Sequence, residues 1–179
     1  MAFHLAVERD ADDYFTSDPL GRYLAYIEGC RDNLPRTAYT LATSPWWYAF
    51  DDPKAPHDSH LERLEIGDVL DYEREDGVLC WIRVHLISAF TGRITLFYPR
   101  VYAYSLAMES DLRAVHGDWR YDEIVSDGTP GRLVHTIEWA SGSKWVITAS
   151  DIHHEYKPAE QIETQQPPLA AVSAESHVS

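Results

Sequence analysis

Long apolar runs are missing from this sequence. No stretch approaches the roughly 18 consecutive apolar residues that a membrane-spanning helix requires, and Met1–Asp10 has no basic start followed by an apolar core. The chain holds only two cysteines, Cys30 and Cys80, which lie far apart and form no C-x-x-C pair. Together these absences predict reduced thiols in a cytoplasmic protein that does not insert into a membrane.

Basic residues are also scarce. Lys and Arg number 15 against 29 Asp and Glu, which gives a formal net charge of −14. This balance argues against binding to nucleic acids or anionic membranes, because both require basic patches that neutralise phosphates. An acidic surface can instead steer a basic protein partner toward its binding site. The alternative is that the charge only keeps the protein soluble.

Recognisable catalytic and cofactor motifs are absent as well. The sequence contains no G-x-S-x-G, no phosphate-binding G-x-x-x-x-G-K and no G-x-G-x-x-G, which excludes enzymes that depend on these loops. The histidine pairs His57/His60 and His153/His154 have loose spacing and no cysteine beside them. Adjacent histidines on a strand also point to opposite faces. We therefore predict neither a cofactor nor a metal.

What the sequence does contain is a readable β-hairpin. Two runs rich in β-branched and aromatic residues, Arg132–Ala140 and Lys144–Tyr156, flank Ser141-Gly142-Ser143, a connection typical of hairpins. If these three residues form the loop, Trp139 faces Trp145 across the two strands. This register gathers the apolar residues on one face, so we expect both tryptophan rings to be buried.

The same face of the hairpin carries titratable side chains. Its apolar members are Leu133, Ile137, Trp139, Trp145, Ile147 and Ala149. His135, Asp151 and His153 share that face, and the register puts His135 diagonal to Asp151. A carboxylate that orients a histidine is a common arrangement for a general base, so these three are candidate catalytic residues if the sheet encloses a cavity. The alternative is a core histidine satisfied by Asp151, without any activity.

The rest of the chain predicts one helix followed by strands. Asp18-Pro19 and Gly29 are start and stop signals for a helix, and Arg36–Thr43 is strand-like in composition. Further strands are expected at His60–Ile66, Val69–Arg74, Val78–Ser88, Arg93–Leu106 and Trp119–Val125. The predicted fold is mainly β (α+β), an antiparallel meander that forms a barrel or a two-sheet sandwich with one short N-terminal helix. Residues 1–156 form one domain, and the Pro-, Gln-, Ala- and Ser-rich residues 157–179 form a disordered tail.

A turn around Thr91-Gly92 joins the predicted strands Val78–Ser88 and Arg93–Leu106. Pairing across this turn sets Leu86 against Phe97. Pro99 interrupts the second of these strands and cannot donate a hydrogen bond to a neighbour. We therefore expect a β-bulge near Pro99.

A loop rich in aromatic residues is the best candidate for binding a partner. It combines Trp46, Trp47 and Tyr48 with Asp51 and Asp52. Large rings with charges around them resemble a binding hot spot. The alternative is that the three aromatic side chains attach the loop to the body of the protein.

Four short segments form a further pattern: Ser44-Pro45-Trp46-Trp47-Tyr48, His57-Asp58-x-His60-Leu61-Glu62, His135-x-x-Glu138-Trp139 and Asp151-Ile152. This pattern resembles small acidic β-rich bacterial proteins that are usually described as uncharacterised, over about residues 40–156. The resemblance implies no catalytic set. In size and charge these proteins look like immunity-type binders.

Two functional hypotheses follow. In the first, the chain is a cytoplasmic binding protein, such as an immunity or accessory protein, that engages a basic protein through acidic loops. In the second, it is a small-molecule-binding β-barrel or a barrel enzyme that uses His135, Asp151 and His153. The first requires an acidic surface patch, and the second requires an enclosed pocket that contains these three side chains. The absence of a catalytic motif favours binding over catalysis.

Overall fold

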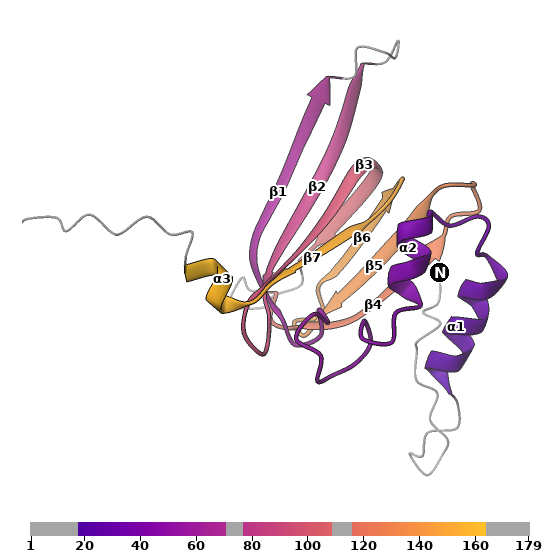
Figure 1. Cartoon of the computed structure of the whole chain (residues 1–179). Coiled ribbons are helices and arrows are strands. Elements are labelled where there is room, and N and C mark those ends of the chain that lie inside the picture. The colour runs from indigo at the N-terminus through magenta and orange to yellow at the C-terminus, as the bar shows by residue number, and fades with distance from the viewer. Residues whose placement is uncertain (1–17, 71–76, 109–115, 164–179) are drawn as a thin grey trace, which may run out of the picture.

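The structure is a computed structural model of the 179-residue chain and describes residues 18–70, 77–108 and 116–163. These residues form one antiparallel sheet and three short helices (Figure 1). The helices are α1 (Pro19–Gly29), α2 (Arg36–Ala42) and α3 (Ala159–Glu163). The strands are β1 (His60–Leu70), β2 (Val78–Ile87), β3 (Arg93–Ala107), β4 (Trp119–Ser126), β5 (Leu133–Trp139), β6 (Lys144–Ala149) and β7 (His153–Lys157). The prediction of a mainly β fold with a short N-terminal helix is confirmed.

All seven described strands belong to this one sheet, in the order β1-β2-β3-β6-β5-β4, with β7 also paired to β3. One side of the 15-residue strand β3 pairs with β2, and the other side pairs with β7 and then β6. The edge strands β1 and β4 approach each other at an isolated bridge between His60 and Asp118. They form no ladder within the described residues. The sheet therefore does not close, and the expectation of a barrel or a two-sheet sandwich is wrong.

Helix α1 explains why the edge strand β4 needs no further strand beside it. The Tyr23 hydroxyl donates to the Ile124 carbonyl at 2.8 Å and accepts from the Ile124 N–H at 3.1 Å. The Tyr26 hydroxyl accepts from the Ser126 N–H at 3.2 Å. Exposed strand edges leave backbone groups unpaired, and covering them with a helix is one way to protect them. Two tyrosines of α1 thus take the place of a neighbouring strand.

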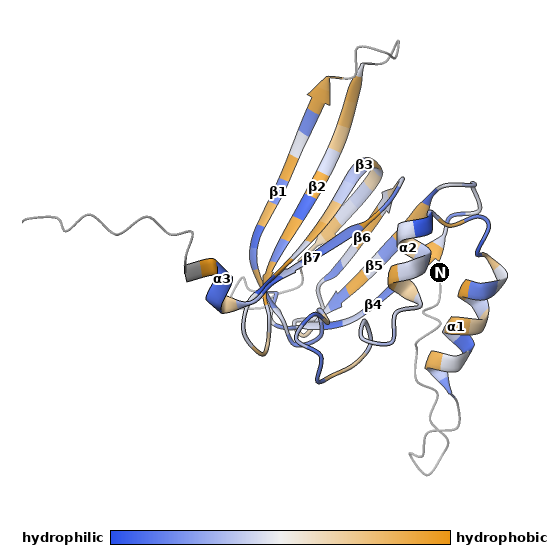
Figure 2. Ribbon diagram, viewed as in Figure 1, coloured by the Kyte–Doolittle hydropathy of each residue, from blue (hydrophilic) through white to orange (hydrophobic). Residues whose placement is uncertain are grey.

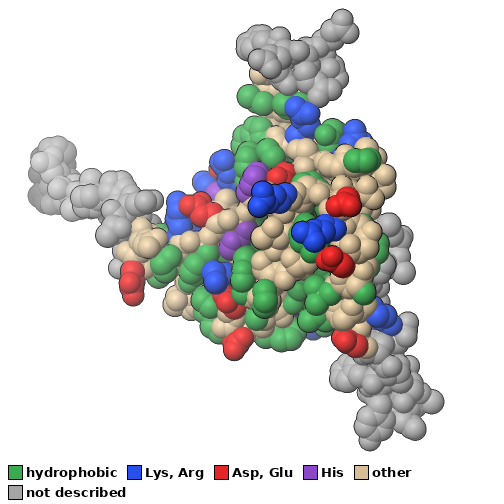
Figure 3. All heavy atoms as spheres, turned by 45° about the vertical axis from the view of Figure 1, so that its right-hand side comes forward, with side chains coloured by type: hydrophobic (Ala, Val, Ile, Leu, Met, Phe, Trp, Pro, Cys, Tyr) green, Lys and Arg blue, Asp and Glu red, His purple; other side chains and the backbone are tan. Residues whose placement is uncertain are grey.

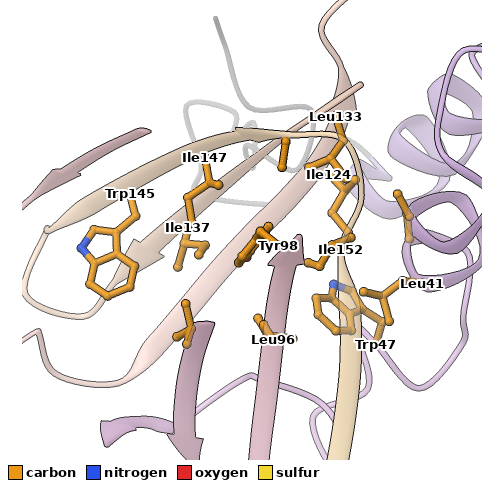
Figure 4. Close-up of a cluster of buried hydrophobic side chains, with 14 of the residues drawn as sticks. Leu41, Trp47, Leu96, Tyr98, Ile124, Leu133, Ile137, Trp145, Ile147 and Ile152 are labelled. Carbon is orange, nitrogen blue, oxygen red and sulfur yellow. The ribbon is translucent and has the colours of Figure 1, made fainter. Parts of the chain in front are cut away.

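The hydrophobic core lies between the sheet and the segment that contains α1 and α2. Apolar and polar residues alternate along β1 and β2 (Figure 2), as expected for a sheet with one buried face. The buried side chains come from both layers (Figure 4) and include Tyr23, Ile27, Leu41, Trp47, Ile82, Leu96, Tyr98, Ile124, Leu133, Ile137, Trp145, Ile147 and Ile152. The helices and the sheet therefore share one core.

Helix α1 begins and ends where the sequence signals predict. The Asp18 carboxylate accepts a hydrogen bond from the Gly21 N–H at 2.8 Å and caps the helix. Tyr23 and Ile27 are buried. Leu20 and Leu24 stay 39% and 37% exposed.

Helix α2 corrects the strand predicted at Arg36–Thr43. Pro35 occupies the N-cap position with φ −56°, and a proline at a helix start costs no hydrogen bond. The helix buries Ala38, Leu41 and Ala42, which lie three and four residues apart on one face. The threonine and tyrosine content of this segment suggested a strand, but burial of that small apolar face determined a helix instead.

The pairing of β2 with β3 differs from the prediction. Leu86 lies opposite Ile94 rather than Phe97, a shift of three residues. The shift arises because the connection after β2 is long. Within this connection the Ser88 N–H donates to the Gly92 carbonyl at 3.1 Å. An odd shift exchanges the two faces, so Phe97 lies on the outer face. The bulge expected near Pro99 is confirmed, because a single residue of β2, Trp81, lies opposite two residues of β3, Pro99 and Arg100.

The hairpin of β5 and β6 keeps its predicted faces but not its predicted partners. Ile137, not Trp139, lies opposite Trp145. The Trp139 N–H donates to the Ser143 carbonyl at 3.0 Å, and Gly142 adopts a φ of +86° in the turn. The shift of two residues is even, so the same side chains face the core. Both tryptophans are buried as predicted, and their ring centroids lie 5.0 Å apart.

The predicted strand Lys144–Tyr156 is interrupted after Ala149 and continues as β7. Residues 157–163, assigned from the sequence to the tail, complete β7 and form α3. The remainder of that predicted tail, residues 164–179, lies outside the described residues. Within the three described ranges, no helix has the length and apolar character needed to cross a membrane.

Candidate functional site

A buried hydrogen-bonded network connects β3, β4 and β5. The Tyr98 hydroxyl lies 2.7 Å from His135 Nδ1, and His135 Nε2 lies 3.0 Å from Asp122 Oδ2. Tyr98 and His135 are fully buried, and Asp122 is 4% exposed. We call these three residues the buried triad.

The partners of His135 define its tautomer. Asp122 offers acceptor oxygens to Nε2, so Nε2 carries the proton and donates. Nδ1 then accepts from the Tyr98 hydroxyl. Burial, with the negative Asp122 nearby, raises the pKa of Tyr98 well above its ordinary value, so the hydroxyl keeps its proton. With this arrangement of protons, both ring nitrogens of His135 have a hydrogen-bond partner.

Two indole rings complete the coordination of Asp122. Trp47 Nε1 donates to Oδ2 at 2.9 Å, and Trp119 Nε1 donates to Oδ1 at 3.1 Å. Both tryptophans are buried, and Figure 4 shows Trp47 within the core cluster. With His135, three N–H donors converge on one carboxylate, which is what a buried carboxylate requires.

A β-bulge in β4 brings Asp122 into the core. Trp119 pairs with Trp139, but Tyr121 pairs with Glu138, so one extra residue lies between them. Trp119 and Asp122 are therefore both buried, whereas Arg120 and Tyr121 are exposed. Regular alternation from Trp119 would place position 122 on the outer face. Asp122 is therefore not recognisable as a core residue from the alternation in the sequence.

The structure does not assemble the predicted group of His135, Asp151 and His153. Both ring nitrogens of His135 are engaged by Tyr98 and Asp122. Asp151 instead accepts from the Ile152 N–H at 2.8 Å and lies 4.0 Å from His153 Nε2. The side chain of His153 is half exposed. The shifted hairpin register and the break before β7 separate the end of this run from His135.

The aromatic loop packs on the body of the protein. Trp47 is buried, and the Tyr48 ring meets the Tyr23 ring edge-on at 5.5 Å between centroids. Trp46 is partly buried, 4.8 Å from the ring of His154, with the Lys54 ammonium 5.3 Å from its own ring centroid. These three rings are therefore part of the core or rest on it.

The two acidic candidates next to this loop differ in their surroundings. Asp51 is exposed. Asp52 is half-buried, accepts from the Lys54 N–H at 2.9 Å and forms an ion pair with its ammonium at 3.8 Å. Asp51 is thus free to meet a partner, whereas Asp52 also shapes the loop.

A pocket of about 350 Å³ lies beside the buried triad. It is bordered by the start of α1, the aromatic loop and β4, and its wall includes Leu20, Trp47, Tyr48, Phe50, His57, Trp119, Tyr121 and Asp122. Leu20, Phe50 and Tyr121 are exposed, whereas Trp47, Trp119 and Asp122 are buried. We call this cavity the Asp122 pocket. Its wall is mainly aromatic and apolar, with the Asp122 carboxylate at its buried side and the guanidinium of Arg120 as a second charged group.

The histidines considered for metal binding contact different partners. His57 Nδ1 lies 3.0 Å from Asp58, and His60 Nδ1 lies 2.7 Å from Asp118. His154 Nε2 donates to the Lys54 carbonyl at 2.9 Å. Within the described ranges, no group of three or more His, Cys, Asp or Glu side chains could hold a metal ion.

Comparison with protein-family models, with curated proteins and with solved structures finds no match in any of the three.

Proposed function

We propose that this protein binds a small, flat, mainly apolar organic molecule in the Asp122 pocket. The observation that carries this proposal is the pocket itself: about 350 Å³ with a largely aromatic wall and one buried carboxylate. Ligand pockets typically have volumes of roughly 300–1,000 Å³, apolar walls and a few fixed polar groups. Two fused aromatic rings suit this volume.

The buried triad supports the proposal because it fixes the pocket wall. Asp122 holds the indole N–H groups of Trp47 and Trp119, which both line the pocket. A wall that is fixed before the ligand arrives loses little conformational entropy on binding. His135 in turn orients Asp122 from the side of β5. The hydrogen bonds of the core thereby preorganise a binding surface.

The same geometry favours binding over catalysis. A general base needs a free lone pair within reach of a substrate proton. Both nitrogens of His135 are engaged, and Asp122 already accepts three hydrogen bonds. We therefore assign the triad a structural and positioning role.

The neutral naphthalene dye prodan, which has two fused rings, tests this proposal by fluorescence titration. Leu20→Trp places a larger side chain in the wall of the pocket, and we expect it to weaken dye binding about tenfold. Leu24→Trp is the matched control, since Leu24 lies one turn further along α1 with similar exposure and does not line the pocket. Equal affinities of the two variants, or no dye binding by the wild type, would exclude the proposal.

A second candidate function is binding of a basic protein partner. Phe50 is 67% exposed, and the exposed Asp51 follows it directly. An aromatic anchor beside a carboxylate is typical of partner contacts, and a net charge of −14 would accelerate association with a basic protein. Basic and acidic side chains are interspersed on the face in Figure 3, so the net charge alone does not single out a contact surface. The loop at Phe50 is therefore the proposed contact.

Charge reversal distinguishes this second candidate. Basic proteins captured from the native host by the wild type should be lost with Asp51→Lys and retained with Asp32→Lys, which makes the same change at another exposed position. Capture that is the same for all three proteins would argue against this contact. A cytoplasmic, immunity-type role is proposed together with this candidate. The free thiols of Cys30 and Cys80 are compatible with a reducing compartment.

A further inference from the structure

A larger cavity, of about 640 Å³, lies on the outer face of the sheet. Arg83, His85, Arg93 and Thr95 line it and alternate along β2 and β3 with the buried residues of the core face. Residues of β1, β7 and α3 complete the wall. We call this cavity the outer groove, and it is separate from the Asp122 pocket.

Positive charge predominates in the outer groove although the whole chain is acidic. Arg63, Arg83, Arg93 and Lys157 line it, against the two lining carboxylates of Glu62 and Glu155 and a third, Glu65, beside Arg63 and Arg83. These two carboxylates, Glu62 and Glu155, are paired with Arg93 at 2.8 Å and with Lys157 at 3.4 Å. In a chain of net charge −14, this concentration of cations gives the groove a local potential opposite to that of the molecule.

Donors outnumber acceptors at the β1–β2 side of the groove. Glu65 lies 3.2 Å from the guanidinium of Arg63, 3.3 Å from that of Arg83 and 3.4 Å from His85 Nε2. The hydrogen bond from His85, with the two arginines, lowers the pKa of Glu65. Each guanidinium has five N–H donors, so one carboxylate cannot satisfy both. Arg63 and Arg83 both line the groove, and their side chains are 62% and 40% exposed.

Aromatic rings hold one of these arginines in place. The Arg83 guanidinium lies 5.0 Å from the ring centroid of Phe97 and 5.5 Å from that of Trp81. Contact with ring faces leaves the N–H groups at the edge of the guanidinium plane available. A guanidinium held in this way is suited to bidentate contact with an oxyanion.

We propose that the outer groove binds a small multivalent oxyanion, with Arg63 and Arg83 as its primary contacts and Arg93 and Lys157 as secondary ones. Phosphate and carboxylate groups share the required chemistry, since both present several oxygens to a guanidinium fork. Glu65 pairs with both of these guanidinium groups. A bound oxyanion competes with it.

Calorimetric titration with inorganic pyrophosphate and, separately, with citrate at constant ionic strength tests this proposal. We expect saturable binding of at least one of the two to the wild type, and the tighter one identifies the source of the oxyanion. Arg83→Gln should weaken binding about tenfold, as expected for the loss of charge-assisted hydrogen bonds. Arg36→Gln, at an exposed position on α2, removes the same charge elsewhere and should leave binding unchanged.

Glu65→Gln provides a test in the opposite direction. This variant removes the competing carboxylate, so we expect pyrophosphate or citrate to bind several-fold more tightly than to the wild type. A network that serves only folding would give no gain. Absence of saturable binding by the wild type, equal weakening by Arg83→Gln and Arg36→Gln, or no gain with Glu65→Gln would each overturn the proposal.

Discussion

His135 Nε2 lies 3.0 Å from Asp122 Oδ2, and both side chains are buried. This contact joins β5 to β4 at the buried side of the Asp122 pocket. Asp122 also accepts hydrogen bonds from Trp47 and Trp119. A single carboxylate therefore connects the stability of the core with the shape of the pocket.

Replacement of Asp122 by alanine should destabilise the protein strongly. The change leaves the N–H groups of Trp47, Trp119 and His135 buried without their acceptor. We expect the free energy of unfolding to fall by about 3–5 kcal/mol in a urea titration. Asp32→Ala, at an exposed position, should change it by less than about 0.5 kcal/mol. Similar values for the two variants would show that the carboxylate does not organise the core.

Trp145→Ala tests the packing of the hairpin. Trp145 is buried and contacts the rings of Trp139 and His116 at centroid distances of 5.0 and 4.9 Å. Truncation of a buried tryptophan costs about 3–5 kcal/mol. Trp81→Ala is the control on the outer face, where the ring is partly exposed, and should cost clearly less. A thermal melt that ranks the two variants in the reverse order would contradict the described core.

Alanine substitutions at two glycines with positive φ distinguish the stability cost of backbone strain from that of steric contact. Gly92 (φ +123°) and Gly128 (φ +88°) both occupy conformations that favour glycine. A Cβ at Gly128 meets nothing within 4 Å, whereas at Gly92 it would lie 2.5 Å from the Lys157 carbonyl oxygen. We expect Gly128→Ala to cost about 1–2 kcal/mol and Gly92→Ala to cost about 2 kcal/mol more. Chemical denaturation measures both. Equal losses would mean that β7 does not pack there.

The pH dependence of stability should report on His154. Burial lowers the pKa of His154, whose Nε2 lies 2.9 Å from the Lys54 carbonyl. Because the folded state favours the neutral ring, the unfolded chain binds more protons below about pH 6.5. The stabilisation is therefore present above that pH and is lost as the pH falls through the lower pKa of the folded state.

Two neighbouring variants measure this contribution. His154→Gln should reduce the decrease in Tm between neutral and mildly acidic pH. His153→Gln changes the adjacent, half-exposed histidine and should leave that decrease as in the wild type. If the two variants behave alike, the buried position of His154 does not control the acid response.

The sequence predicts which strands form. It also predicts which face of a strand is buried wherever the error in the predicted register is an even number of residues. The hairpin of β5 and β6 is shifted by two residues, so Trp139 and Trp145 keep their faces although their partners change. The β2–β3 pairing is shifted by three residues, so Phe97 lies on the outer face. Side chains alternate between the two faces of a strand with a period of two residues. The length of the turn determines whether the shift is even, which keeps the faces, or odd, which exchanges them.

The buried triad could be predicted only in part. His135 was found because it shares a face with apolar residues of β5. Its partner Asp122 was not found, because the bulge after Trp119 reverses the alternation in β4. Tyr98 comes from a strand far away in the sequence. Partners from distant segments depend on topology, which local patterns do not encode.

The most direct test of the central claim is a proton–nitrogen correlation spectrum of the six tryptophan indoles during titration with naphthol. Trp47 and Trp119 line the Asp122 pocket and donate to its carboxylate. Trp145 is buried away from it and serves as the internal reference. We predict saturable shifts of the Trp47 and Trp119 signals with the Trp145 signal unchanged. Unchanged Trp47 and Trp119 signals, or equal shifts of all six, would contradict the proposed binding site.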